Sequence, residues 1–116
     1  MRDEDLNLLQ GTLDLLVLKA LVFGARHGYA VARWVRDATD GVLEIEDGAL
    51  YAALHRIERR GWVATEWGLS ESNRRAKYYT LTARGREQLE RKASAWARYA
   101  EAVSKVLRAP AEIAGA

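Results

Sequence analysis

This 116-residue chain contains no cysteine and a single proline. The absence of cysteine excludes disulfide scaffolds, iron–sulfur clusters, thiol catalysis and cysteine-ligated zinc. No apolar run approaches the roughly 20 residues that a bilayer-spanning helix needs. Residues 1–5 carry three acids and one arginine, which is not the pattern of a secretory signal. We therefore expect a cytoplasmic chain without a membrane partner.

Recognisable catalytic and metal-binding patterns are also missing. The only histidines, His27 and His55, fall in separate predicted elements and lack the spacing of a metal pair, so no metal site is expected. The chain has no GxSxG, P-loop or GxGxxG motif, and no close carboxylate pair with an acid–base partner. We expect neither an enzyme nor a bound cofactor.

What the chain does have is one small globular domain with an uneven charge distribution. Hydrophobic residues make up 49% and charged residues 29%, as in globular proteins, and a core of this size would gain from dimerisation. Residues 1–53 have a net charge of −4, and residues 54–98 a net charge of +6. The basic segment indicates either a surface for a polyanion or an ordinary solvated helix face.

Apolar periodicity predicts three helices in the first half of the chain. The first covers 13–23, with Thr12 as its N-cap and Gly24 as its stop. The second covers 28–39 and the third 47–60.

The second half changes period. Residues 62–67 and 76–81 are rich in β-formers around a polar loop at 68–73, which predicts a hairpin. A last helix is predicted over 83–108, capped by Thr82. This order predicts a mainly α fold with a small β-hairpin, the winged helix-turn-helix, followed by a long C-terminal helix. We divide it into a winged-helix DNA-binding domain (1–81), a dimerisation helix (82–109) and a tail (110–116).

The third predicted helix is the candidate recognition helix. Leu50, Leu54 and Ile57 form its apolar stripe, so the opposite face is free. That face carries small residues and then hydrogen-bond donors, as a helix entering the major groove requires: Gly48, Ala49, Ala52, His55, Arg56 and Arg59, with Tyr51 at the flank. The alternative is an exposed helix rich in alanine and arginine; the neighbouring hairpin favours DNA.

Charged residues also occur at the start of this helix and on the hairpin that follows it. Arg74, Arg75 and Lys77 begin the return strand, where they can contact phosphates or enter a minor groove. The alternative, which is compatible with DNA contact, is that they protect an edge strand from aggregation. Glu46 and Asp47 suit a helix N-terminus through the macrodipole, which we favour over cytosine reading.

The last helix carries two apolar rows with a seven-residue repeat. The rows are Leu89, Trp96 and Val103, and Ala93, Ala100 and Leu107. A small domain cannot cover a stripe of this length, so we expect a homodimer interface. Trp96, with Tyr99 beside it, would be either interface core or the wall of a flat aromatic pocket. The other tryptophans, Trp34, Trp62 and Trp67, are expected to pack in the core and along the strands.

Several segments together resemble the PadR family of bacterial transcriptional regulators. They are LQGTLDLL at 9–16, GYAV at 28–31, GALYAALHRIE at 48–58, GWV at 61–63, Trp67 and RRAKYYTLTARGR at 74–86. The combination of LYxxLxRxE with KYYxLTxxGR is specific, and the resemblance runs from about Leu9 to Trp96.

The resemblance implies a dimer of winged helices that acts as a repressor. It implies that Tyr51 faces DNA and that Arg74, Arg75 and Lys77 form a basic wing. Trp96 matches a tryptophan of the C-terminal helix that, in some drug-responsive members of the family, lines a pocket between subunits. The chain departs from the family pattern at Ala49, where Ser or Thr is usual, and at Ala52, where Pro is usual. Glu46 replaces a capping Ser, Thr or Asn.

We therefore expect a homodimeric regulator of a pseudo-palindromic double-stranded DNA operator, released by a small hydrophobic or aromatic inducer. The alternatives are a winged-helix protein–protein adaptor, which the paired basic surfaces disfavour, and a small hydrolase, which lacks a catalytic constellation.

Overall fold

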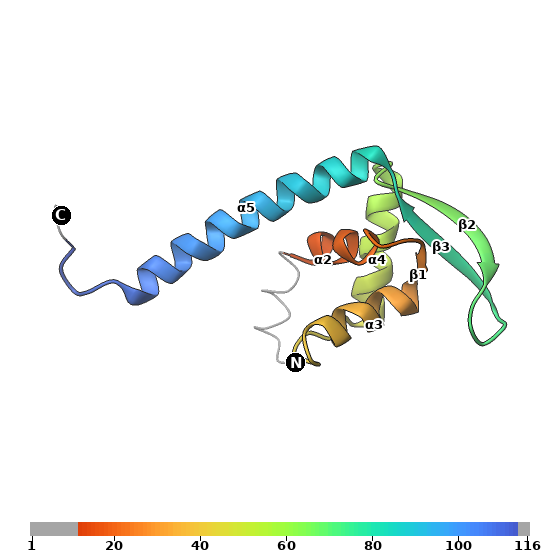
Figure 1. Cartoon of the computed structure of the whole chain (residues 1–116), viewed down its shortest axis with the longest axis horizontal. Helices are drawn as coiled ribbons and strands as arrows, with labels where there is room; N and C mark the ends of the chain where they lie inside the picture. Colours follow the sequence, from red (N-terminus) through yellow and green to blue (C-terminus); the bar gives the residue numbers. More distant parts are fainter. Residues whose placement is uncertain (1–11, 114–116) are drawn as a thin grey trace.

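The computed structural model describes residues 12–113, which form four helices and a three-stranded antiparallel sheet (Figure 1). In chain order the elements are α2 (Leu13–Ala20), β1 (Arg26–His27), α3 (Gly28–Ala38), α4 (Asp47–Arg59), β2 (Val63–Leu69), β3 (Arg75–Leu81) and α5 (Ala83–Arg108). This arrangement confirms the predicted fold class. The acidic start, the first residues of the 9–16 motif and the end of the tail lie outside the described residues.

Helix α2 lies at the centre and contacts α3, α4 and α5. Its side chains Leu13, Val17 and Leu18 are buried. The helix ends at Ala20, so the prediction that it reaches residue 23 is wrong. The chain tightens there into i→i+3 turns, with the Leu21 N–H donating to the Leu18 carbonyl, because it must turn into β1. Phe23 is consequently 65% exposed.

Helix α4 has the predicted buried stripe, with Leu50, Leu54 and Ile57 all at most 1% exposed. The helix ends in a Schellman-type turn, in which the Trp62 N–H donates to the Ile57 carbonyl. Gly61 occupies the left-handed position of this turn with φ +76°, a conformation that glycine adopts without steric cost. The turn sends the chain directly into β2.

The sheet has the strand order β1-β3-β2. Strands β2 and β3 pair from Val63↔Leu81 out to Leu69↔Arg75, and the two-residue β1 pairs with β3 at Tyr79 and Tyr78. The hairpin projects beyond the helices (Figure 1). Its outer end has no core to pack on, so Trp67 is 57% exposed: it packs along the strands, with Arg75 over its ring, and not in the core.

The remaining tryptophans differ in burial. Trp62 is 8% exposed and belongs to the core, as predicted. Trp34 is partly buried and packs against the core cluster. Both therefore contact the buried cluster, whereas Trp67 lies on the projecting hairpin.

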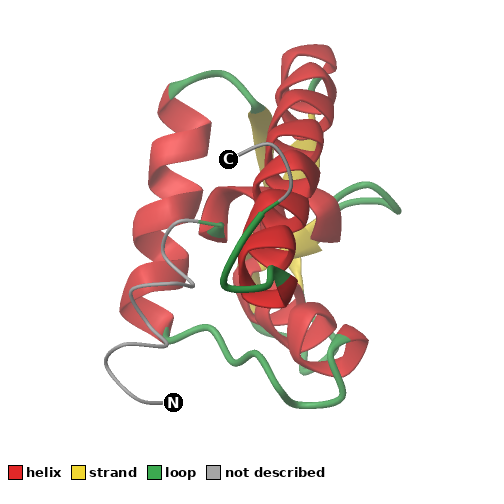
Figure 2. Ribbon diagram, turned by 90° about the vertical axis from the view of Figure 1, so that its left-hand side faces the viewer, coloured by secondary structure: helices red, strands yellow, loops and turns green. Residues whose placement is uncertain are grey.

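Helix α5 starts on the domain and then leaves it. The Thr82 hydroxyl accepts a hydrogen bond from the Gly85 N–H at 3.1 Å, which confirms the predicted N-cap. Gly85 is buried against the Trp62 carbonyl, and Leu89 is the last residue of the two predicted rows to pack on the core. Beyond that point the helix extends away from the other elements, on the side opposite the hairpin (Figures 1 and 2).

Candidate nucleic-acid interface

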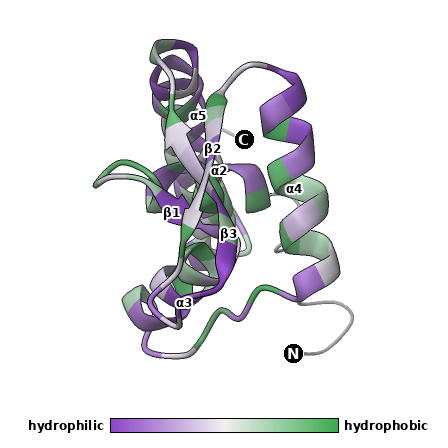
Figure 3. Ribbon diagram, turned by 90° about the vertical axis from the view of Figure 1, so that its right-hand side faces the viewer, coloured by the Kyte–Doolittle hydropathy of each residue, from purple (hydrophilic) through white to green (hydrophobic). Residues whose placement is uncertain are grey.

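A groove of about 810 Å³ separates the hairpin from the starts of α3 and α4. Figure 3 views the molecule from the hairpin side, with α4 on one flank. The groove is lined mainly by aromatic and cationic side chains: Tyr29, Arg33, Tyr51, Trp67, Arg74 and Arg75. Lys77 adds another cation, and Glu71 is the acid at its edge. Cations interleaved with aromatic rings suit a polyanion whose backbone and bases both approach the surface.

The face of α4 opposite its apolar stripe points away from the core. Gly48, Tyr51, Ala52, His55 and Arg59 are exposed. The two other residues predicted for this face are partly buried: Ala49, which packs against the core, and Arg56. Further along, a shallow hollow of about 340 Å³ is lined by Ala52, His55, Arg56, Arg59 and Arg60. The structure therefore gathers most of the predicted helix residues on one surface.

Arg56 is held by α2 rather than projecting freely. Its Nε and Nη2 donate to the two carboxylate oxygens of Asp14, at 3.2 and 2.5 Å. This hydrogen bonding raises the pKa of Arg56 further above its ordinary value. Arg60 lies 3.9 Å from the same carboxylate. The bidentate geometry fixes α4 against α2, a function that the sequence analysis missed because Asp14 lies 42 residues earlier in the chain.

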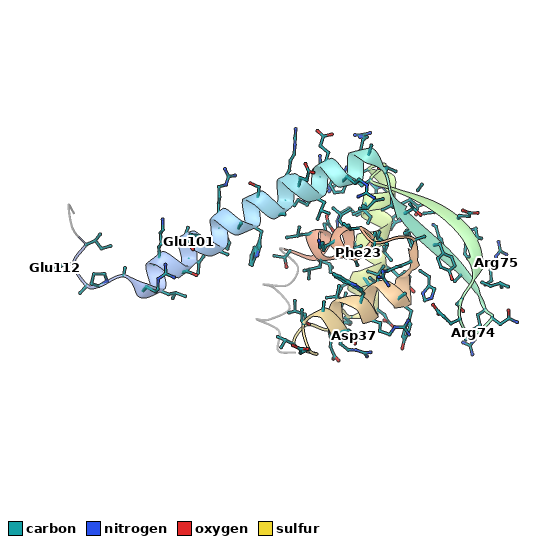
Figure 4. All side chains as sticks on the ribbon, in the orientation of Figure 1. Phe23, Asp37, Arg74, Arg75, Glu101 and Glu112 are labelled. Atoms are coloured by element: carbon teal, nitrogen blue, oxygen red, sulfur yellow. The ribbon has the colours of Figure 1, made fainter. Side chains whose placement is uncertain are left out.

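The three hairpin cations lie in three different surroundings. Lys77 Nζ is 2.9 Å from Glu58 Oε1 on α4, and this hydrogen bond raises the pKa of Lys77. Arg75 stacks over the ring of Trp67 at 4.5 Å from its centroid. Arg74 and Arg75 lie at the outer end of the hairpin, far from Glu101 and Glu112 on the opposite side (Figure 4).

The cations of α4 and the hairpin also differ in whether an acidic side chain pairs with them. Within residues 12–113, no acidic side chain pairs with Arg59, Arg74 or Arg75. Their charges remain available to an external anion, whereas those of Arg56 and Lys77 are already matched.

The loop between β2 and β3 is tied to the start of α3 through His27. The His27 Nδ1 accepts a hydrogen bond from the Ala30 N–H at 3.1 Å, so the Nε2 carries the proton and donates to Glu71 Oε2 at 3.2 Å. A hydrogen bond from its own backbone N–H and the one from His27 lower the pKa of Glu71. No local sequence pattern indicates this pair, because its members lie 44 residues apart. The pair holds the hairpin at a fixed distance from α3.

The apolar rows of α5 are largely uncovered. Trp96, Val103 and Leu107 are 40%, 38% and 80% exposed. Ala93 is exposed and Ala100 half-buried. The rings of Trp96 and Tyr99 lie 6.0 Å apart, centroid to centroid. These residues form an apolar surface outside the domain core.

Two other features, a metal-binding group and a membrane-spanning helix, are absent from residues 12–113. Across this stretch, His, Asp and Glu nowhere gather in a group that could hold a metal ion. Over the same residues, none of the helices combines the length and apolar character needed to cross a membrane.

Residues 17–91 match the model of the transcriptional regulator PadR-like family. A PadR family transcriptional regulator from Eggerthella lenta has a similar structure, with a TM-score of 0.78 at 32% identity, over 92% of this chain and 91% of its own. A transcriptional regulator from Clostridium thermocellum gives a TM-score of 0.78 at 27% identity, over 85% of this chain and 96% of its own.

Two curated relatives are more weakly informative. Uncharacterized protein X of Lysinibacillus sphaericus is 25% identical over 97 residues, covering 84% of this chain and 89% of the relative. A 37.1 kDa protein in a transposon of Streptomyces fradiae is 36% identical over 85 residues, which is 73% of this chain but only 23% of that longer protein.

Proposed function

This chain belongs to the PadR-like family of transcriptional regulators, a family of regulators rather than of enzymes, and from that premise we propose that it is a cytoplasmic homodimeric repressor that binds duplex DNA. The observation that carries the proposal is the groove between α4 and the hairpin. Two cations that line this groove, Arg74 and Arg75, have no acidic partner in the described chain, and neither has Arg59 in the hollow further along α4. An external polyanion would neutralise them.

In this proposal α4 enters the major groove with its exposed face. Gly48 and Ala52 are exposed and small, so the helix backbone can approach the base edges closely. Tyr51 and His55 follow along the same face and supply hydrogen-bonding groups. The hairpin cations Arg74 and Arg75 bind phosphates, which fixes register without reading sequence.

Helix α5 provides the dimer interface in this proposal. Its exposed side chains Trp96, Val103 and Leu107 repeat along the helix, so a second copy could cover them with the same surface. A two-fold axis there would present two α4 helices to a pseudo-palindrome with half-sites about 10 bp apart. Residues up to 81 are then the DNA-binding part and α5 the dimerisation part.

An effector would act at the same helix. The neighbouring rings of Trp96 and Tyr99, with the small Ala93 and Ala100 in the adjacent row, offer a place for a flat aromatic molecule between two α5 helices. Such a molecule would release DNA by favouring a dimer spacing that misfits the operator. Two roles for Trp96, interface core and pocket wall, make opposite predictions for Trp96→Ala: a weakened dimer, or an intact dimer that no longer binds aromatic ligands.

Fluorescence anisotropy tests the proposal, with duplex DNA taken from the region upstream of the gene that encodes this chain (the upstream duplex). Wild-type protein should bind that duplex more tightly than an unrelated duplex of equal length. The double variant Arg74→Ala/Arg75→Ala should weaken binding to both duplexes alike. It should reduce the slope of log affinity against log salt by roughly 0.9 for each phosphate that the protein no longer neutralises.

A charge-matched control is available on α5. Arg91 and Arg98 each follow a residue of the first row, Leu89 or Trp96, by two positions. Two positions correspond to about 200° around the helix, so both arginines lie on the side opposite the apolar rows. Arg91→Ala/Arg98→Ala removes the same charge without touching the groove or the rows, so its salt slope should equal that of the wild type. An unchanged slope in the hairpin variant would contradict the phosphate assignment. No affinity for any duplex would favour the protein–protein adaptor instead.

A further inference from the structure

Gly28, the first residue of α3, lies directly beneath the side chain of Tyr51 on α4. A Cβ atom built on Gly28 would be 2.8 Å from both Cε1 and Oη of the Tyr51 ring, a distance that real Cβ atoms essentially never show. The three atoms nearest to that position all belong to Tyr51. The ring therefore occupies the space that any other residue at position 28 would fill.

We propose that Gly28 is a positioning residue for DNA recognition: its missing side chain forms the seat that fixes the Tyr51 phenol at the edge of the groove. The proposal rests on the proposed function, because it assigns a task to a residue of the same site. Gly28 is itself buried, so it would act through the Tyr51 ring above it.

The backbone of Gly28 does not require glycine. Among the described glycines, those with φ in the left-handed region are Gly24, Gly41 and Gly61, and Gly28 is not one of them. A residue with a side chain could adopt this backbone without strain, and alanine has the higher helix propensity. The reason for glycine at this position is therefore the space above it, which Tyr51 occupies.

The seat matters because Tyr51 is otherwise only loosely held. Its side chain is 51% exposed, and it faces a groove that also contains Arg33 and Arg74. A long exposed side chain loses rotamer freedom when it binds, which weakens affinity. A ring already packed against Gly28 and the entry to α3 has lost part of that freedom in the free protein, so it meets DNA preorganised.

The crowded atoms are at the far end of a flexible side chain and not in the backbone. Gly28→Ala should therefore fold normally and displace the Tyr51 ring instead of disrupting α3. This separates the variant from most substitutions at buried glycines. It also allows binding to be measured on a folded protein.

A double-mutant cycle on the full chain tests the proposal, with anisotropy on the upstream duplex as the readout. Tyr51→Ala should weaken binding about tenfold, the usual cost of removing one well-placed side chain from the groove. Gly28→Ala should produce most of that effect. In the Tyr51→Ala background the same Gly28→Ala change should alter affinity by less than about twofold, since the residue it displaces is gone. Thermal melting of all four proteins should show that each is folded.

Two outcomes of the cycle would overturn the proposal. One is a folded Gly28→Ala protein with wild-type affinity. The other is an equal reduction of affinity by Gly28→Ala in both backgrounds, which would mean that Gly28 acts independently of Tyr51.

A second measurement separates this inference from the proposed function. The Gly28 α-protons lie close to the Tyr51 ring, so their NMR resonances should carry a ring-current shift that Tyr51→Ala abolishes. Absence of that shift would overturn the seat even if DNA binds. A wild-type chain that shows the shift but binds no DNA would overturn the role in recognition together with the proposed function.

Discussion

Helices α4 and α5 carry the same kind of apolar stripe, but the domain covers only one of them. On α4, Leu50, Leu54 and Ile57 are at most 1% exposed. On α5, Trp96, Val103 and Leu107 are 40%, 38% and 80% exposed. Apolar spacing therefore predicts which face of a helix favours burial, and the fold decides whether anything within the chain can bury it.

The difference follows from length. Helix α5 has 26 residues, which at 1.5 Å per residue is about 39 Å. The molecule measures 61 × 31 × 21 Å, so a straight helix of that length exceeds either of its shorter dimensions. The first turns of α5 pack on the core through Gly85 and Leu89. The remainder extends past it, and a second copy is the partner that we propose.

The largest expected effect compares one leucine from each helix. Leu54→Ala should destabilise the fold by about 2–5 kcal/mol, because it leaves a cavity in a fully buried site. Leu107→Ala removes the same atoms from an exposed position and should change the stability of the domain by less than about 0.5 kcal/mol. Urea unfolding measured at low protein concentration would provide both values. Similar losses of stability for the two variants would mean that α5 folds back on the core in solution.

A charge on the uncovered stripe should act on association instead of folding. Leu107→Asp would bury an unpaired carboxylate in the proposed interface, which should cost about 2 kcal/mol or more and raise the dimer dissociation constant about 30-fold. Ala102→Asp adds the same charge about 140° from the centre of the apolar rows and is the matched control. Analytical ultracentrifugation would compare them. If the dimers of both variants dissociate equally, the apolar rows do not form the interface.

Within α4, two arginines three residues apart should separate stability from binding. Arg56→Ala leaves Asp14 without its bidentate partner and should cost about 1–2 kcal/mol of folding stability, a modest figure because the Arg56 side chain is 41% exposed. Arg59→Ala breaks no ion pair in the described chain and should weaken DNA binding without loss of stability. Chemical denaturation and anisotropy on both variants would check this. A fully stable Arg56→Ala protein with impaired operator binding would mean that Arg56 contacts DNA, as the sequence pattern predicts, instead of stabilising the fold.

The smallest effect concerns the tie between Glu71 and His27. Because the pKa of Glu71 is lowered in the folded protein, its contribution is present above its ordinary pKa of 4.5 and is lost as the pH falls through the lower folded value. Wild-type protein should therefore melt slightly above Glu71→Gln near neutral pH, and the two melting curves should converge below pH 4.5. Glu66→Gln, also on the hairpin, controls for the loss of one negative charge. A difference that persists at low pH would contradict the assignment.

Local patterns predicted most of the fold. Thr82 and the apolar repeat placed the last helix at 83–108, as the structure has it, and the third helix was placed within one residue of its observed end. The errors occur where tertiary structure decides. The two-residue strand β1 has no periodicity of its own and forms because Arg26 and His27 pair with β3. Trp67 packs along the strands and not in the core, because it lies on the projecting hairpin.

The candidate site was predictable in its composition but not in its contacts. Residue type and helical spacing placed Tyr51, His55 and Arg59 on one exposed face. They could not reveal that Arg56 is bound to Asp14, since such a pair depends on how α2 packs against α4. The seat of Tyr51 on Gly28 is equally a product of packing between helices.

The mass of the protein–DNA complex tests the central claim most directly. The account requires that the uncovered stripe of α5 joins two chains, each of 13.0 kDa, on one duplex. Sedimentation equilibrium of wild-type protein with the upstream duplex, at micromolar concentration, should give a complex of two chains per duplex, and the free protein should sediment as a dimer. A monomeric protein that binds as one chain per duplex, or that forms no complex at all, would contradict the account.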